Sequence, residues 1–343
     1  MKIIYPPTID WDWMVQRPQQ ICRRLAERGL DVFYCNATQR PWLPPEKLSQ
    51  RLTIIHDFQK YIQAESIDQD TVFWVSWPGH CELIGRLCSA SGQKPIVIYD
   101  AVDDFPEWRK YVDAMVELCD AIVTSSQPLY ERYVSYGKPV TLIRNGADFA
   151  LFNQVTKALM PVPKELAAVD GPVVGFLGAL GPWIDVKLLT ALAEEGLHGG
   201  WKVVLVGPPF GAPLPREAPI ISVGRKPYQV LPEYVARFNA CILPFAMTPT
   251  SIASNPIKLY DYLATGKPVI ATPIPEVLIL SHLVFVAEDA PGFIELVRHA
   301  LRNPKDGMEQ RIAFARANSW ESRVDQVVEV IRASGMAKTR RIY

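Results

Sequence analysis

Hydrophobic and polar positions follow two alternating patterns along this chain. Short runs of β-branched and other apolar residues are typical of buried parallel strands, and the longer amphipathic segments between them are typical of crossover helices, the first over about Arg17–Arg28. The pattern therefore predicts an α/β protein with two doubly wound sheets. The first set of predicted strands is Lys2–Tyr5, Val32–Cys35, Leu52–His56, Val72–Ser76, Ile96–Asp100, Ala121–Ser125 and Val140–Arg144, and the second is Val173–Gly178, Val203–Gly207, Ile220–Val223, Ala240–Pro244, Pro268–Thr272 and Val284–Ala287.

The segment Thr156–Pro172 separates the two sets. It contains prolines and has weak hydrophobic patterning, as an interdomain linker does, and 343 residues also favour two domains. We therefore predict one Rossmann-like domain over residues 1–160 and another over residues 161–318. A final helix is predicted over residues 319–343, with Ser319 as its N-cap and Glu321 in its first turn, and is expected to pack on the first domain.

Composition narrows the function classes. The 36 Lys and Arg residues balance 36 Asp and Glu, so no overall field would recruit nucleic acid or an acidic membrane. The six cysteines have no CxxC or zinc-site spacing, and they are interpreted as buried apolar residues of a reduced compartment. No apolar run approaches the roughly 18–20 residues of a spanning helix, and no signal-peptide pattern is found, which predicts a soluble cytoplasmic protein. The absence of GxGxxG and GxxxxGK[ST] disfavours an NAD oxidoreductase and a P-loop NTPase.

One stretch, SNPIKLYDYLATGKPVIAT, predicts an anion site. Asn255 is the expected N-cap, Pro256 the first helical residue and Gly266 the helix end. Lys258 then lies at the third helical position, where the macrodipole disfavours a cation. Free backbone amides, the dipole and the ammonium group together suit a diphosphate. Asp261 on the same face would suit the hydroxyls of a ribose, and an ordinary Lys258–Asp261 surface pair is the alternative.

A second candidate site follows a strand of the first domain, in IYDAVDDFPEW. Asp100, Asp103 and Asp104 crowd at the strand end, and mutual repulsion should raise the pKa of at least one carboxyl, as a general base requires. We expect Asp103 or Asp104 to orient an attacking hydroxyl and to take its proton if the reaction inverts configuration. The alternative is a cap for the helix that begins near Pro106.

These motifs, in their order along the chain, resemble those of GT-B glycosyltransferases, particularly bacterial family 4 enzymes that build surface polysaccharides. The resemblance covers essentially the whole chain and includes WDWMVQRPQQICRRLAERGLDVFYCN, IYDAVDDF, AIVTSSQPLYERY, VTLIRNGADFALF, GFLGALGPWID, WKVVLVGP and NPIKLYDYLATGKPVIAT. It implies two Rossmann-like domains facing across a cleft. A sugar would pass from a nucleoside diphosphate, UDP for instance, in the second domain to a saccharide or lipid-linked acceptor in the first, with no cofactor and no metal.

The resemblance also implies residue roles in the donor domain. Lys258 would contact the diphosphate and act in catalysis, and Asp261 would contact the ribose. Many members carry two glutamates eight positions apart, whereas Ala253 stands at the first position here, so the carboxylate contact to the sugar is missing or moved to Asn255 or Asp185. Plain turns and strand ends remain alternatives for the other donor-side residues. The expected donor-binding set is Gly178, Trp183, Asp185, Gly207, Pro208, Arg225, Tyr228, Asn255, Lys258 and Asp261.

The segment WDWMVQRPQQ should line the acceptor side, because aromatic rings stack on sugars and Gln or Arg side chains bind hydroxyls. The expected acceptor-binding residues are Trp11, Trp13, Gln16, Arg17 and His80, with interdomain packing as the alternative for the tryptophans. A peripheral contact with the inner face of an anionic membrane is expected from a basic and apolar surface, and a solvated helix and loop is the alternative. That surface comprises Arg17, Arg23, Arg24, Arg40, Trp42 and Leu43. A nucleotide-sugar epimerase and a noncatalytic nucleotide-sugar sensor remain alternative functions.

Overall fold

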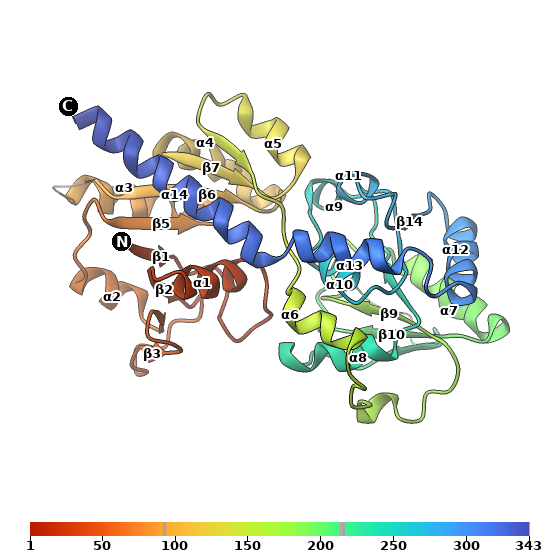
Figure 1. The fold of residues 1–343 in the computed structure, drawn as a ribbon. Coiled ribbons are helices and arrows are strands. Elements are labelled where there is room, and N and C mark those ends of the chain that lie inside the picture. Colours follow the sequence, from red (N-terminus) through yellow and green to blue (C-terminus); the bar gives the residue numbers. More distant parts are fainter. Residues whose placement is uncertain (92–93, 213, 215–216, 343) are drawn as a thin grey trace. The chain divides into compact units, whose positions relative to one another are not determined.

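The computed structural model describes residues 1–91, 94–212, 214 and 217–342. The chain divides into two compact units (Figure 1): unit 1 holds residues 1–145 together with the helix that begins at Trp320, and unit 2 holds Gly146–Ser319. The predicted boundary at residue 160 is therefore corrected to Asn145–Gly146. The expected linker is part of unit 2 because its apolar side chains are buried there: Phe152, just before it, and Leu166, within it, are both 0% exposed.

Unit 1 is built on an eight-stranded sheet with the order β3-β4-β2-β1-β5-β6-β7-β8. All neighbouring strands are parallel except β3, which pairs antiparallel with β4. Counted from β1, the strand order reverses between β1 and β5, and the carboxyl ends of strands at such a switch point are where doubly wound folds bind ligands. The strands are β1 (Lys2–Tyr5), β2 (Asp31–Cys35), β3 (Glu46–Lys47), β4 (Leu52–Ile55), β5 (Thr71–Val75), β6 (Ile96–Ala101), β7 (Ala121–Thr124) and β8 (Val140–Leu142).

The last helix, α14, belongs to unit 1 and packs on α1, as Figure 1 shows. Trp320 at its start is 0% exposed. Arg24 Nε donates to Glu321 Oε1 at 2.7 Å, and Arg28 donates to the Glu321 carbonyl at 2.7 Å. The helix is thus held by a buried indole and by ion pairs along α1. The helices of unit 1 are α1 (Arg17–Glu27), α2 (Phe58–Ala64), α3 (Cys81–Ala90), α4 (Arg109–Leu118), α5 (Gln127–Val134) and α14 (Trp320–Ile342).

Unit 2 has a six-stranded parallel sheet with the order β11-β10-β9-β12-β13-β14. Its order also reverses next to its first strand, between β9 and β12, so both units have Rossmann-like topology. The strands are β9 (Val173–Leu177), β10 (Lys202–Val206), β11 (Ile220–Ser222), β12 (Ala240–Leu243), β13 (Val269–Ala271) and β14 (Phe285–Val286). The helices are α6 (Phe149–Phe152), α7 (Val186–Gly199), α8 (Leu231–Arg237), α9 (Pro249–Ala253), α10 (Ile257–Ala264), α11 (Pro275–Leu278), α12 (Ala290–Arg302) and α13 (Met308–Ala317).

Every predicted strand is present, with ends within about two residues of those expected. The prediction missed β3, because its two exposed residues form no apolar run. All six cysteines are free thiols, and only Cys81 is not fully buried. No helix in the described part of the chain is both long and apolar enough to cross a membrane.

Candidate functional site

The amino-terminal turn of α10 lies at the carboxyl edge of the unit 2 sheet. The helix begins at Ile257 with Pro256 as its N-cap, so Lys258 is the second helical residue and not the third. The N-cap Pro256 makes no side-chain hydrogen bond to the helix, and the predicted cap Asn255 uses its Nδ2 to donate to Tyr260 Oη at 3.1 Å and to a Glu276 carboxylate oxygen at 2.6 Å. The first helical amides near Lys258 are therefore left without a side-chain cap.

Lys258 and Asp261 form an ion pair that is not the surface pair considered as an alternative. Lys258 Nζ lies 3.3 Å from Asp261 Oδ2, and the Asp261 side chain is 0% exposed. The other carboxylate oxygen accepts the Asp148 backbone N–H at 3.1 Å. Burial raises the pKa of Asp261 to about 6, and the Lys258 ammonium opposes that rise. Both carboxylate oxygens already accept protein hydrogen bonds, so the expected ribose contact has no support in this geometry.

Tyr228, from the motif RKPY, lies beside this pair. Its ring centroid is 5.5 Å from Lys258 Nζ, and its hydroxyl donates to Asp148 Oδ2 at 3.3 Å. Because Tyr228 is only 8% exposed, it supports Lys258 and is not available to frame a base, as had been expected. Arg225 is exposed, and Lys226 pairs with Glu165. RKPY is thus more than a plain turn, because its Tyr228 contacts both Lys258 and Asp148.

The loops after β9 and β10 touch through their glycines. A Cβ on Gly207 would lie 1.8 Å from the Gly178 carbonyl oxygen, so no larger residue fits at that position. Gly178 itself has φ +155 and donates its N–H to the Val206 carbonyl at 2.9 Å. Leu180 N–H donates to the Pro208 carbonyl at 3.0 Å. The close approach expected between Gly207 and a nucleotide is, in the structure, an approach between two loops.

The loops after β9 and β12 are also joined. Ala246 N–H donates to the Trp183 carbonyl and Asp185 N–H to the Pro244 carbonyl, both at 2.8 Å. The Asp185 carboxylate accepts Leu188 N–H at 2.9 Å and so caps α7. One Asp185 carboxylate oxygen is therefore engaged at a helix end, and a sugar contact by this residue stays a prediction. The Trp183 ring lies 5.8 Å from that of Phe210.

Sequence reasoning missed Glu276. It lies in the first turn of α11, is 1% exposed, and binds the Asn255 amide. Glu276 is therefore a buried carboxylate in contact with Asn255, which is one of the two residues expected to take over the sugar contact. The available signal was weak: a glutamate a few residues after the strand β13, in TPIPEV.

In unit 1, Arg17 is buried and its guanidinium donates hydrogen bonds to several fixed acceptors. Its Nε and Nη2 bind the Asp100 carboxylate at 2.9–3.1 Å, and Nη1 donates to the Ile143 carbonyl at 2.9 Å and to Asn145 Oδ1 at 3.1 Å. Asp100 also accepts Trp74 Nε1–H at 3.0 Å. The expected acceptor-binding role of Arg17 is corrected, because the side chain is only 3% exposed.

The next two carboxylates of DAVDD have opposite environments. Asp104 is bound by Arg109 and Arg132, and although burial would raise its pKa, these arginines lower it to about 2. Asp103 is half-buried, and within the described part of the chain no hydrogen-bond or ion-pair partner is found for its carboxylate. Burial, with added repulsion from Asp100, raises the pKa of Asp103 to about 6. A base that works near neutral pH fits Asp103 and not Asp104.

The other acceptor-side candidates differ in exposure. Trp13 is 41% exposed and Gln16 is exposed, so both can reach a ligand. Trp11 packs edge-on against Tyr34 with ring centroids 5.0 Å apart. His80 is 8% exposed, and its Nε2 donates to the Pro7 carbonyl at 2.7 Å, because a carbonyl can only accept. Burial lowers the pKa of His80, so it is a neutral, buried histidine and not a free cleft group.

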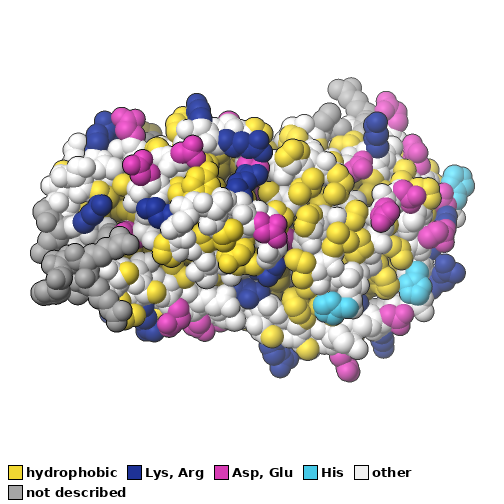
Figure 2. Space-filling view, turned by 90° about the horizontal axis from the view of Figure 1, so that it is seen from above, with side chains coloured by type: hydrophobic (Ala, Val, Ile, Leu, Met, Phe, Trp, Pro, Cys, Tyr) yellow, Lys and Arg dark blue, Asp and Glu magenta, His cyan; other side chains and the backbone are white. Residues whose placement is uncertain are grey.

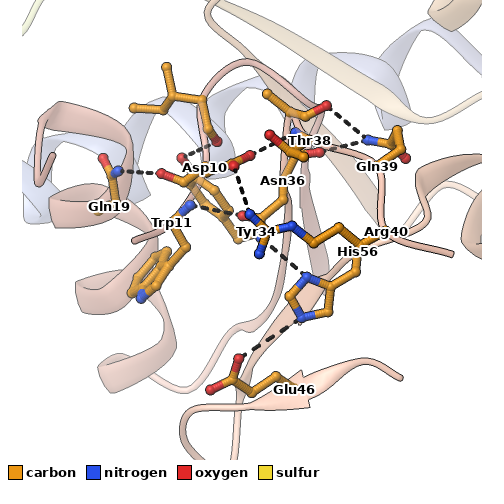
Figure 3. A network of polar contacts seen from close by, with 12 residues as sticks. Asp10, Trp11, Gln19, Tyr34, Asn36, Thr38, Gln39, Arg40, Glu46 and His56 are labelled. Atoms are coloured by element: carbon orange, nitrogen blue, oxygen red, sulfur yellow. Dashed lines mark hydrogen bonds and ion pairs between the residues drawn. The ribbon is translucent and has the colours of Figure 1, made fainter. Parts of the chain in front are cut away.

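A polar network joins the loops after β1, β2 and β4 (Figure 3). Asp10 accepts Thr38 N–H at 2.7 Å and lies 3.7 Å from Arg40. Asn36 Nδ2 lies 3.3 Å from His56 Nδ1, which must be the acceptor, so the His56 proton is on Nε2. Sequence reasoning identified only Arg40 among these residues. The network fixes the rim of the unit 1 sheet next to Trp11.

The expected membrane surface is smaller than predicted. Arg17 is buried, and Arg24 is 5% exposed and paired with Glu321, so neither can meet a lipid headgroup. Trp42, by contrast, is 75% exposed. Figure 2 shows basic and acidic side chains interspersed on the face it presents. The residues of the original surface that remain outside the core are Arg23, Arg40, Trp42 and Leu43.

Metal ligands do not gather in the described residues: no three His, Cys, Asp or Glu side chains there come together as a metal site. The carboxylates of DAVDD are separated by their partners, Arg17 for Asp100 and two other arginines for Asp104.

Two Rossmann-like units on one chain, the second followed by a helix that returns to the first, define the GT-B fold. Solved structures with this fold match nearly the whole chain. The α,α-trehalose 6-phosphate synthase of Burkholderia multivorans has a TM-score of 0.68 at 12% identity, covering 98% of this chain and 99% of that one. Anabaena HepE in complex with UDP-glucose has a TM-score of 0.67 at 14% identity, covering 97% and 100%. At such low identity these likenesses show the fold alone.

Among curated proteins, the chain is similar to the putative teichuronic acid biosynthesis glycosyltransferase TuaH of Bacillus subtilis strain 168. The two are 27% identical over 288 residues, which cover 75% of this chain and 70% of TuaH. No protein-family model matches the chain.

Proposed function

We propose that this protein is a glycosyltransferase that transfers a sugar from a nucleoside-diphosphate sugar to a saccharide acceptor. The observation that carries the proposal is Lys258, fixed in the first turn of α10 beside uncapped backbone amides at the carboxyl edge of the unit 2 sheet. Amides and ammonium at a helix start form an anion site. Similarity to TuaH over most of the chain supports a sugar-transfer reaction.

The proposed donor is a UDP-sugar bound by unit 2. Two proteins that share the fold support this choice, since HepE was solved with UDP-glucose and the trehalose-6-phosphate enzyme of E. coli with UDP-2-fluoro glucose. Negative charge grows on the diphosphate as the glycosidic bond breaks. A fixed Lys258 ammonium would therefore stabilise the transition state more than the bound donor, with no metal required.

The proposed acceptor group in unit 1 is oriented by Asp103. Among the described residues no hydrogen-bond or ion-pair partner is found for its carboxylate, and a pKa of about 6 leaves it ionised at neutral pH and able to take a hydroxyl proton. If the reaction retains configuration, Asp103 orients the hydroxyl and no separate base is needed. Exposed Trp13 and Gln16 are proposed to contact the sugar rings of the acceptor.

The acceptor is proposed to be a lipid-linked saccharide of a polysaccharide under synthesis, and the similarity to TuaH, named for teichuronic acid biosynthesis, supports the polysaccharide part. The surface formed by Arg23, Arg40, Trp42 and Leu43 would then contact anionic lipid. Flotation with anionic liposomes tests this part. Binding that weakens on Trp42→Ala supports it, and protein that stays wholly in the soluble fraction removes the membrane contact without affecting the transfer reaction.

A panel of nucleoside diphosphates in thermal-shift measurements tests the donor. UDP should raise the melting temperature above the other bases, because only a bound ligand stabilises the native state. Hydrolysis of the matching nucleotide sugar without acceptor would then exclude a noncatalytic sensor. Equal shifts for all bases, or none for any, would contradict a donor site in unit 2.

A further inference from the structure

We infer that Asp261 is a positioning residue that holds the Lys258 ammonium in place for the diphosphate, and is not a ribose ligand. This inference rests on the proposed function for its choice of diphosphate. Its physical content, that one buried carboxylate fixes one lysine, can be tested without any donor.

The ammonium lies between two groups of different kinds. Asp261 Oδ2 is 3.3 Å from Lys258 Nζ, and the Tyr228 ring centroid is 5.5 Å from it. The ammonium has three N–H donors, and the carboxylate takes one of them. Lys258 is 16% exposed, so its end is held while still open to a ligand.

Helix physics explains why the lysine needs such a partner. A cation in the first turn of a helix opposes the macrodipole, and a Lys followed by Asp three residues later is the less favourable order for an exposed pair. Asp261 overcomes both effects because it is 0% exposed, and an ion pair with a buried member is screened less by water. Without the Asp261 charge, Lys258 would have little reason to stay at the helix start.

The carboxylate is itself anchored independently of the lysine. Asp261 Oδ1 accepts the backbone N–H of Asp148 at 3.1 Å, and the preceding residue Ala147 donates its N–H to the Asn318 carbonyl at 3.0 Å. Asp148 also accepts the Tyr228 hydroxyl at 3.3 Å. When a diphosphate attracts the ammonium, Asp261 therefore stays in place, which is the preorganisation that electrostatic catalysis requires.

The charge state of Asp261 adds a pH dependence. The groups that face it are Lys258 on its own helix, Asp148 at the start of α6 and the neighbouring Tyr262. Burial raises the pKa of Asp261 to about 6, so the ionised form that holds the lysine predominates above that pH and is lost as pH falls through it.

Lysine acylation of the Asp261→Asn variant tests the inference directly. Mass spectrometry would follow the acetylation rate of Lys258 by an N-hydroxysuccinimide ester, with exposed Lys60 as the internal reference. Removing the neighbouring carboxylate favours the neutral, reactive amine, so Lys258 should react at least about threefold faster while Lys60 is unchanged. The matched control is Asp289→Asn, which keeps the α12 cap and should match wild type.

Kinetics separate positioning from a merely structural role. Asp261→Asn should lower kcat about tenfold or more with a smaller change in donor KM, and Asp261→Glu, which restores a carboxylate, should recover part of it. If Asp261→Asn does not fold, wild-type affinity for UDP-glucose between about pH 7.5 and about pH 5.5 decides instead: it should weaken on acidification, and not in Lys258→Ala.

The outcomes keep the two proposals apart. Unchanged Lys258 acylation in folded Asp261→Asn, or a pH-independent affinity for UDP-glucose in the wild type, would overturn the positioning role. Faster acylation with no binding of any nucleotide by the wild type would uphold the positioning role and contradict the proposed function.

Discussion

Arg17 and Lys258 are basic residues in the first turns of helices at the carboxyl edges of two sheets with the same core strand order. Arg17 is 3% exposed and donates to Asp100, to a backbone carbonyl and to Asn145. Lys258 has one carboxylate partner and one aromatic neighbour, and it keeps part of its end exposed. The first is a structural ion pair, and the second is a site that can take a ligand.

The comparison shows that a cation at a helix start does not by itself identify a binding site. What matters is how many donors the fold already uses. The planar guanidinium of Arg17 donates to several fixed acceptors, whereas the Lys258 ammonium donates one hydrogen bond among the described residues. The same difference separates Asp104, which two arginines bind, from Asp103, which has no ion-pair partner in the part of the chain that the structure describes.

The largest expected effect is on stability and concerns the buried ion pair between Arg17 and Asp100. Arg17→Ala leaves the Asp100 carboxylate buried without its partner, and should lower the free energy of unfolding by about 3–5 kcal/mol. Denaturant unfolding measures it, with Arg51→Ala, which loses an exposed pair to Asp31, as a control that should cost less than about 1 kcal/mol. A stable Arg17→Ala protein that fails only in acceptor binding would restore the acceptor role to Arg17.

Lys258→Ala tests the functional side. Turnover should fall about 100-fold to 1,000-fold, because the variant loses a charge that acts mainly in the transition state. The melting temperature should change little, since the side chain is partly exposed and Asp261 can be protonated at modest cost. Near wild-type turnover at saturating donor would mean that the lysine is no more functional than Arg17.

Asp103→Asn and Asp104→Asn extend the contrast to the acceptor side. Asp103→Asn should lower transfer about 100-fold and leave the melting temperature near that of wild type. In the wild type, transfer should fall as pH drops through about 6, where Asp103 becomes protonated. If both variants transfer sugar normally, neither carboxylate orients the acceptor.

Asp104 should instead affect acid stability. Its pKa is lowered from 3.8 to about 2 in the folded protein, so its contribution to stability is present above pH 3.8 and is lost as pH falls towards 2. Asp104→Asn should therefore remove part of the acid-induced loss of stability in that window, as measured by urea unfolding at a series of pH values. An unchanged pH dependence of unfolding would argue against its ion pairs.

The smallest expected effect on sugar transfer is that of removing divalent metal ions with a chelator. EDTA should leave transfer unchanged, because the anion site already has a lysine and helix amides. Activity abolished by EDTA and restored by Mg²⁺ or Mn²⁺ would show that a metal ion, and not Lys258 alone, neutralises the charge of the diphosphate.

The sheets could be predicted because buried parallel strands are continuous apolar runs. The domain boundary could not, since the burial of Leu166 in the weakly patterned segment depends on packing against distant parts of unit 2. The short edge strand β3 could not be predicted either, because both of its residues are exposed and form no apolar run.

In the candidate site, the place of Lys258 in the first turn of a helix could be predicted from local helix signals, but one position off and with Asn255 as the expected cap. Its setting could not: the Asp148 amide that anchors Asp261 is 113 residues away in the chain, and the Asp100 partner of Arg17 is 83 residues away. Contacts between residues far apart in the chain determine which cation is structural, and the local sequence cannot predict such contacts.

Calorimetric titration of UDP into the wild type and Lys258→Ala tests the central claim, that the first turn of α10 holds a nucleoside diphosphate. The account predicts saturable binding to the wild type and affinity at least about tenfold weaker in the variant, because a charge-assisted contact to phosphate is lost. Equal affinity of the two proteins for UDP would contradict it.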